Sequence, residues 1–94
     1  MPNRAVIELI NDCRSEKRYS LREFAEPLGV SYNAVALWEA GKMEPKNESV
    51  LAWTRSETPW IKQLGLEIFA ARYGPFVEAL LRSAGAYAAK RVPA

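Results

Sequence analysis

The side chains that most often do chemistry in proteins are scarce in this sequence. It contains no histidine, which removes the commonest general base and the commonest metal ligand. Its single cysteine, Cys13, has no partner for an intrachain disulfide and cannot build a structural zinc site alone. The acidic residues are scattered, with neither paired carboxylates nor a glycine-rich phosphate loop. We therefore expect a protein that is not an enzyme, with no metal, no cofactor and no evident small-molecule ligand.

Cys13 has a simpler interpretation as a small apolar residue. It stands at helical spacing with Val6, Leu9 and Ile10, so we expect its side chain to be buried on one face of a first helix. A lone cysteine suits a reducing compartment. The first residues do not form a signal segment, and no apolar run approaches the length of a membrane span. These features predict a cytoplasmic protein without a membrane partner.

Length and charge limit what the chain can bind. Its 94 residues are enough for one domain with a modest core, and 49% of them are apolar. The net charge is only +2, and basic and acidic residues are nearly balanced as far as residue 58. If this protein binds a polyanion, a few well-placed cations must do so, because the general electrostatic field is weak.

Apolar residues recur with the helical period almost throughout, which predicts an all-α fold of five to six helices. The first helix is capped near Asn3. Ser20 and Glu23 form a capping box at the start of a second helix, which Gly29 ends. Ser31 caps a third helix, closed by Gly41, and a fourth is expected over residues 47–55, with Val50, Leu51 and Trp53 buried.

Two further helices are expected after Thr58-Pro59, which is a strong helix start. Gly74-Pro75 is expected to stop the fifth helix near Tyr73 and to begin a sixth. We divide the chain into residues 1–57 and a C-terminal helical extension, residues 58–94, within the same compact unit.

The C-terminal extension carries more apolar surface than one helix stripe can bury, which predicts a symmetric homodimer. The alternative is that these helices complete the core of a monomer. The residues expected at the dimer interface are Trp60, Leu64, Phe69, Tyr73, Phe76 and Leu80.

Residues 21–40 have a steric pattern of their own. Ala25 is small enough for the next helix to cross closely, Gly29 permits a tight turn, and Val35 and Trp38 pack the third helix on the second. This arrangement leaves the outer face of residues 31–40 free, in a geometry that can enter a DNA major groove.

These residues resemble a known motif. Residues 20–31 read SLREFAEPLGVS and are followed by Val35, by Trp38-Glu39-Ala40-Gly41-Lys42 and by Pro45. The combination is similar to the helix-turn-helix of the phage-repressor-like, or Xre, family, and the resemblance covers about residues 16–57. It implies a lambda-repressor-like DNA-binding domain that acts as a dimer on a palindromic operator in double-stranded DNA. We expect a sequence-specific transcriptional regulator, and the resemblance implies that it is a repressor.

The resemblance also assigns roles to individual residues. The helix of residues 31–40 becomes the recognition helix, and the residues facing base edges are Tyr32, Asn33, Ala36 and Leu37. Asn33 is the best candidate to read a base, because its amide can bond adenine at two atoms. The residues expected to contact phosphates are Ser20, Arg22, Ser31, Lys42 and Lys46.

Three positions depart from the family pattern. Leu21 replaces a glutamine that often contacts the DNA backbone, and Pro27 falls inside the second helix, where it is expected to kink or shorten it. Ala36 and Leu37 stand where many relatives have polar or basic residues. An apolar exposed face leaves a second hypothesis open, namely an adaptor that keeps the fold but binds a protein instead of DNA.

Overall fold

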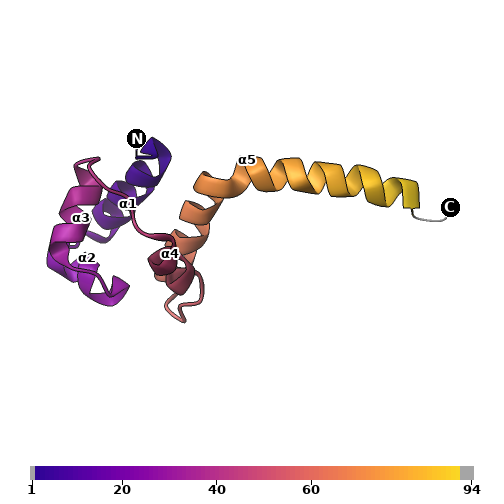
Figure 1. The fold of residues 1–94 in the computed structure, drawn as a ribbon. Coiled ribbons are helices and arrows are strands. Elements are labelled where there is room, and N and C mark those ends of the chain that lie inside the picture. Colours follow the sequence, from indigo (N-terminus) through magenta and orange to yellow (C-terminus); the bar gives the residue numbers. More distant parts are fainter. Residues whose placement is uncertain (1, 92–94) are drawn as a thin grey trace.

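A computed structural model describes the backbone of residues 2–91 and the side chains of residues 2–83. The last three residues of the predicted C-terminal extension therefore lie outside the described residues. Within the residues that the structure describes, the fold is all-helical, with no strand (Figure 1). The five helices are α1 (Arg4–Lys17), α2 (Leu21–Leu28), α3 (Tyr32–Glu39), α4 (Asn47–Thr54) and α5 (Pro59–Arg91).

The predicted helix ends are confirmed for the first three helices. The side chain of Asn3 caps α1 by accepting from the amide of Ala5, 2.9 Å away. Ser20 and Glu23 form the capping box of α2 with bonds of 3.1 and 2.9 Å. Gly29 follows α2 with a φ of +72°, a conformation that glycine adopts at little cost. The capping box and the backbone conformation of Gly29 thus determine where α2 begins and where it ends.

Pro27 does not end α2 early, contrary to the sequence-based expectation. The helix runs one residue further, to Leu28. Pro27 lies in the last turn, so its missing N–H removes one backbone bond and leaves few later residues for its ring to disturb. The proline ring is exposed, so it takes up no space in the core.

All five helices contribute to one core. Its buried members are Val6, Ile10, Phe24, Ala25, Leu28, Val35, Trp38, Val50, Trp53, Ile61, Leu64 and Ile68. Cys13 and Leu21 both pack against the edge of this cluster and are half-buried. The expected burial of Leu51 is wrong: the side chain is 44% exposed, because α4 turns Val50 and Trp53 toward the core instead.

A close approach joins α4 to the first half of α5. A Cβ atom added at Gly65 would lie 2.7 Å from the backbone nitrogen of Thr54 and 2.9 Å from the Cβ of Trp53. Because both distances are shorter than a real side chain allows, only glycine fits here. The first half of α5 is therefore an integral part of the helical body.

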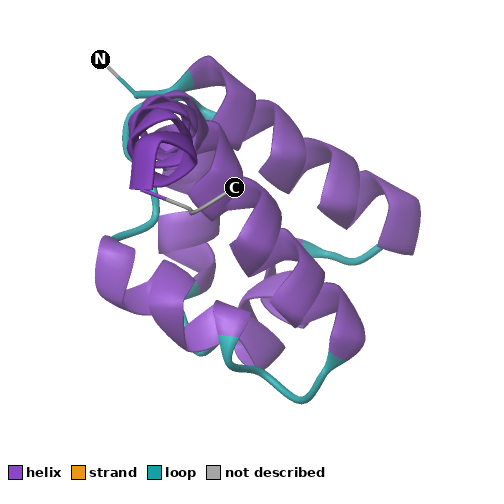
Figure 2. Ribbon diagram, turned by 90° about the vertical axis from the view of Figure 1, so that its right-hand side faces the viewer, coloured by secondary structure: helices purple, strands orange, loops and turns teal. Residues whose placement is uncertain are grey.

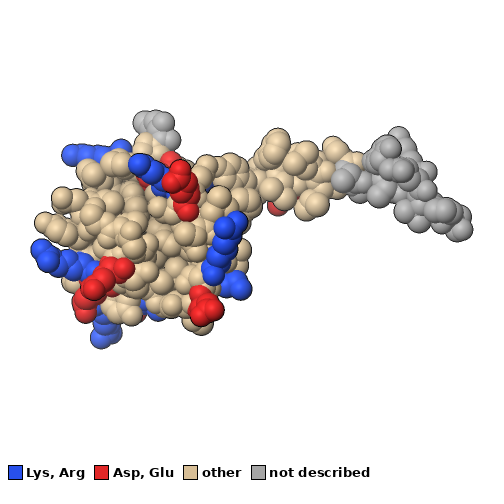
Figure 3. All heavy atoms as spheres, turned by 60° about the horizontal axis from the view of Figure 1, so that its bottom comes forward, with Lys and Arg blue, Asp and Glu red and all other residues tan. Residues whose placement is uncertain are grey.

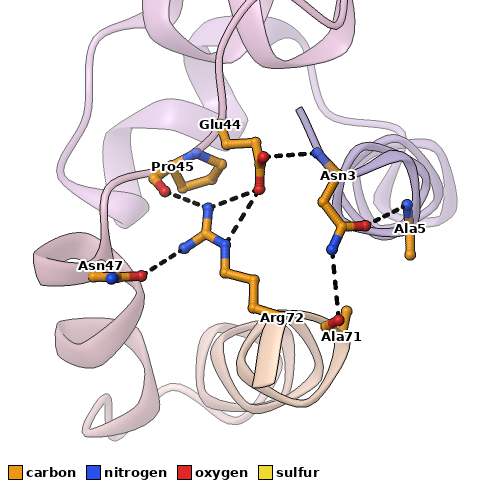
Figure 4. Close-up of polar contacts among 7 residues, drawn as sticks. All are labelled: Asn3, Ala5, Glu44, Pro45, Asn47, Ala71 and Arg72. Carbon is orange, nitrogen blue, oxygen red and sulfur yellow. Dashed lines mark hydrogen bonds and ion pairs between the residues drawn. The ribbon is translucent and has the colours of Figure 1, made fainter. Parts of the chain in front are cut away.

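The predicted break between a fifth and a sixth helix is wrong. Residues 59–91 form one helix, α5, with Pro75 inside it. Figure 1 shows that α5 nevertheless changes direction partway along, and Pro75 accounts for the bend, since proline lacks the N–H that would bond the carbonyl of Ala71. The side-chain amide of Asn3 donates to that carbonyl at 3.5 Å, which gives it another partner (Figure 4).

Beyond the bend, α5 projects away from the four shorter helices. Figure 2 views this segment end-on, in front of the helical body, and Figure 1 shows from the side that the segment stands clear of that body. The molecule measures 56 Å along its longest axis and 31 and 22 Å along the others. None of the helices in the described part of the chain is both long and apolar enough to cross a bilayer.

Candidate nucleic-acid interface

α3 has one buried face and one free face. Val35 and Trp38 point into the core, while Tyr32, Asn33 and Leu37 are exposed. Ala36, the fourth residue expected to face DNA bases, is half-buried. The structure thus brings three of the four candidate side chains together on one accessible surface of an eight-residue helix.

The N-termini of α2 and α3 are closed by serine hydroxyls. Ser20 accepts from the amide of Glu23 and Ser31 accepts from the amide of Ala34, each over 3.1 Å. Both serines are exposed, and a hydroxyl that accepts one bond still has its own O–H to donate. Each can therefore cap its helix and donate to an anion at the same time, in the place where the helix dipole favours negative charge.

Arg22 lies against the recognition-helix candidate. Its guanidinium carbon is 4.8 Å from the centre of the Tyr32 ring, which is cation–π distance. Both side chains are exposed. The contact joins a candidate phosphate ligand on α2 to a candidate base-facing residue on α3, and it holds the two at one edge of the surface.

The other end of α3 is held by an ion pair with α1. The Nε and Nη2 atoms of Arg14 donate to the two carboxylate oxygens of Glu39, the second over 2.7 Å, and Nη1 donates to the carbonyl of Tyr19. The hydrogen bonds to the Glu39 carboxylate raise the pKa of the Arg14 guanidinium above its ordinary value. Glu39 therefore has a structural role, and its partner, 25 residues earlier, gives no signal in the sequence.

The loop after α3, residues 40–46, carries Lys42 and Lys46, both exposed. It is tied down between them by Glu44, whose carboxylate accepts from the backbone amide of Asn3 over 2.6 Å and from the guanidinium of Arg72 over 3.1 and 3.2 Å (Figure 4). Arg72 also donates to the carbonyl of Pro45 and, over 3.0 Å, to the side chain of Asn47.

Arg72 is thus a positioning residue that sequence reasoning missed. Its side chain is 12% exposed and comes from α5, far along the chain from the loop that it holds.

Lys46 stands at the N-cap position of α4, which has no side-chain cap. The first amides of α4 are therefore open to an anion beside a lysine side chain.

The charge on the surface is mixed. On the face that Figure 3 displays, basic and acidic side chains lie beside one another in a few small groups, with uncharged surface between the groups. Glu23 and Glu26 are exposed on the same helix as Arg22. Electrostatic attraction of a polyanion would therefore depend on placed residues, as the composition indicates.

The six residues expected at a dimer interface divide into different environments. Leu64 is only 2% exposed and belongs to the core, so its side chain is not available at a surface. Trp60 is half-buried and stacks on Phe24, with ring centroids 5.6 Å apart, which makes it a packing residue. Phe69, Phe76 and Leu80 are exposed, and Tyr73 is half-buried.

Cys13 and Trp60 line a hollow of about 300 Å³ between α1 and α5. Burial raises the pKa of the Cys13 thiol, which keeps it protonated and unreactive. The described residues contain no group of three histidine, cysteine or acidic side chains able to hold a metal ion.

Comparison with family models, with curated proteins and with solved structures found no match for this chain.

Proposed function

We propose that this protein is a sequence-specific DNA-binding regulator of the helix-turn-helix type, related to lambda-repressor-like domains and acting as a repressor. In this proposal α2 is the positioning helix and α3 is the recognition helix, which enters the major groove. The observation that carries the proposal is the division of α3 into a face anchored by Val35 and Trp38 and a free face bearing Tyr32, Asn33 and Leu37. A recognition helix needs an anchored face and a free face, because its contacts with DNA are useful only if its position is fixed.

Asn33 is the residue that we assign to base reading. It is exposed in the first turn of α3, and the N-terminal residues of a recognition helix are the ones that reach base edges. Leu37, one turn further, offers an apolar contact suited to a thymine methyl group. Tyr32 would lie between the bases and the backbone, steadied by Arg22.

The candidate phosphate ligands lie at the helix N-termini and in the loop that adjoin α3. Ser20 and Ser31 lie at two helix N-termini, and Lys42 and Lys46 lie in the loop that Glu44 and Arg72 hold. Phosphate contacts set the register and orientation of a protein on DNA without reading sequence. The rigid attachment of this loop supports such a role, since a lysine on a fixed loop loses less conformational entropy on binding.

The proposal is tested by selecting bound sites from a random DNA library at two salt concentrations. We expect one enriched sequence that is palindromic, with half-sites about one helical turn, roughly 34 Å, apart. We also expect affinity to fall steeply as salt rises, because lysine and arginine contacts release counterions from DNA. No enrichment at either salt concentration would rule out sequence-specific binding.

A second candidate function rests on one observation. Leu37 and Met43 are both exposed large apolar residues, and the amide of Met43 bonds the carbonyl of Leu37, so their backbones adjoin at the end of α3. Such a patch suits an adaptor that binds a protein through the same face. Salt separates the two functions, because apolar docking weakens little or strengthens as salt rises.

A further inference from the structure

Two aromatic rings beside the hollow between α1 and α5 hold the ammonium group of Lys17. The Nζ atom of Lys17 lies 4.9 Å from the centre of the Trp60 ring and 5.9 Å from the centre of the Tyr19 ring, within the range at which rings attract cations. The planes of the two rings meet at 67°, with centroids 6.0 Å apart, so the rings form two walls at an angle. We call the Tyr19 and Trp60 rings the aromatic corner.

The core fixes the aromatic corner in place. Phe24, which is fully buried, stacks on the Trp60 ring with centroids 5.6 Å apart and planes inclined by 25°. Tyr19 is half-buried and packs against the same core. Because both rings are held by the fold itself, a cation that binds between them does not have to order them first.

The hollow beside the aromatic corner is negatively charged. Its volume is about 300 Å³, and Lys17 and Trp60 line it together with Asp12 and Glu16 of α1 and Glu67 of α5. Three carboxylates against one ammonium group give this lining a net charge of −2, whereas the whole chain carries +2. None of the three acidic side chains forms an ion pair with another residue in the described part of the chain. Their charges are therefore available to a cation from solution.

Lys17 occupies the aromatic corner only weakly. A primary ammonium group is strongly hydrated, and a long flexible side chain loses entropy when it is held in one geometry. Within residues 2–83, the Lys17 ammonium forms no ion pair that would hold it there. A cation whose N–H groups are replaced by methyl groups is the kind that aromatic rings bind well.

We propose that the hollow and the aromatic corner bind a small quaternary or alkyl-substituted ammonium ion, which displaces the Lys17 side chain. The rings receive the charged group, and the apolar surfaces of Leu9 and Leu64 in the lining receive its carbon chain. A volume of about 300 Å³ is at the lower end for small-molecule sites, which favours a ligand of the size of choline. The site lies apart from α3, so the proposal does not depend on DNA binding and adds a ligand that the sequence-based expectations did not include.

Titration of the full chain with choline tests the proposal, with the three indole N–H signals followed by NMR. We expect the signal of Trp60, assigned with Trp60→Phe, to shift, while those of Trp38 and Trp53, which do not line the hollow, stay in place. The neutral analogue of choline in which carbon replaces nitrogen is the matched ligand control. It should bind roughly tenfold more weakly, because it has the same shape without the charge. Equal affinities for the two compounds would overturn the proposal.

Three substitutions test the roles of the charged side chains. Lys17→Gln removes the internal competitor and one positive charge, and should tighten choline binding by roughly threefold or more. Glu67→Gln should weaken it by a similar factor, whereas Glu48→Gln removes an exposed carboxylate that does not line the hollow and should have no effect. All three side chains lie outside the core, so circular dichroism should show an unchanged fold. Unchanged affinity of Lys17→Gln, or equal affinities of Glu67→Gln and Glu48→Gln, would contradict the proposed site.

A free cation and a lipid headgroup share this chemistry, and sedimentation with phosphatidylcholine vesicles separates the two sources. We expect the chain to remain in the supernatant, because the hollow has room for a small molecule and the site was inferred for a ligand in solution. Sedimentation of the chain with the vesicles, combined with no response to free choline, would overturn the assignment to a free cation.

Discussion

The indole N–H of Trp53 donates to the backbone carbonyl of Leu28 over 2.9 Å, in a bond that is buried within the protein. Leu28 is the last residue of α2, where a helix leaves its final carbonyls without intrahelical partners. The amide of Gly29 bonds Glu26 and the amide of Val30 bonds Ala25, so the Leu28 carbonyl depends on α4. A single tryptophan thus fixes the end of α2 relative to α4.

We expect Trp53→Phe to destabilise the protein more than the loss of ring volume alone explains. The substitution leaves the buried Leu28 carbonyl without a donor, which costs about 1–3 kcal/mol in addition to the lost packing. Trp38→Phe is the matched control, since Trp38 is equally buried and its ring packs edge-on against Trp53 without an indole bond among those the structure gives. Urea unfolding measures both. Equal losses for the two variants would show that the bond contributes nothing.

The ion pair between Arg14 and Glu39 should contribute to stability, in contrast to the exposed pair between Arg4 and Glu8. Hydrogen bonds to charged groups contribute up to about 3 kcal/mol, and partial exposure reduces this, so we expect Arg14→Ala to cost about 1–2 kcal/mol. The Arg4 and Glu8 side chains are 92% and 63% exposed, and Arg4→Ala should cost no more than about 0.5 kcal/mol. The same urea measurement distinguishes them, and similar small losses would contradict the expectation.

The capping box of α2 should make stability depend on pH in the acid range. The backbone amide of Ser20 lowers the pKa of the Glu23 carboxyl below its ordinary value of 4.5. A group whose pKa is lower in the folded state stabilises the fold above its ordinary pKa and loses that contribution as pH falls through the folded value. We therefore expect Glu23→Gln to flatten the fall in melting temperature below pH 4.5.

Glu26→Gln is the control for this effect. It removes a carboxylate from the same exposed surface of α2 without touching the capping box. Melting temperatures of the wild type and both variants across the acid range give the comparison. Identical pH profiles for the wild type and Glu23→Gln would show that the capping bond does not couple to folding.

Base reading and phosphate binding predict different results for two substitutions in the proposed DNA surface. Asn33→Ala should cost about 1–3 kcal/mol on the selected operator and relax preference at one base pair, because an amide that bonds adenine at two atoms is lost. Lys42→Ala should weaken binding to all sequences alike and reduce the salt slope by about one. Fluorescence anisotropy on the operator and on scrambled DNA at several salt concentrations measures both. Equal losses for Asn33→Ala on both DNAs would contradict its role.

The parts of the fold that could be predicted from the sequence are those fixed by neighbouring residues. Asn3, Ser20 and Ser31 cap helices through bonds that reach two or three residues along the chain, and Gly29 ends α2 through its own backbone conformation. Val35 and Trp38 follow from helical spacing. These features delimit α3 and its free face before any tertiary contact is known.

The parts that could not be predicted depend on distant partners. Gly74-Pro75 is a strong local signal for a helix break, yet α5 continues through it, and the Ala71 carbonyl that Pro75 leaves free accepts from the side chain of Asn3, 68 residues away. The Arg72 guanidinium gives no sign in the sequence that it will hold Glu44 and the loop after α3. Helical spacing likewise does not reveal whether a second apolar stripe of α5, such as the exposed Leu66, Phe69, Phe76 and Leu80, is covered by the same chain.

The bend in α5 divides one continuous helix into two parts with different support. Before the bend, Ile61, Leu64 and Ile68 bury the helix in the core, whereas Figure 1 shows no other helix beside the part that follows. Most helical stability in proteins comes from the packing of an apolar face, so the second part opens at a lower free energy than the first. Backbone amides of a single helix should therefore exchange their hydrogens at two different rates, with the change at the bend.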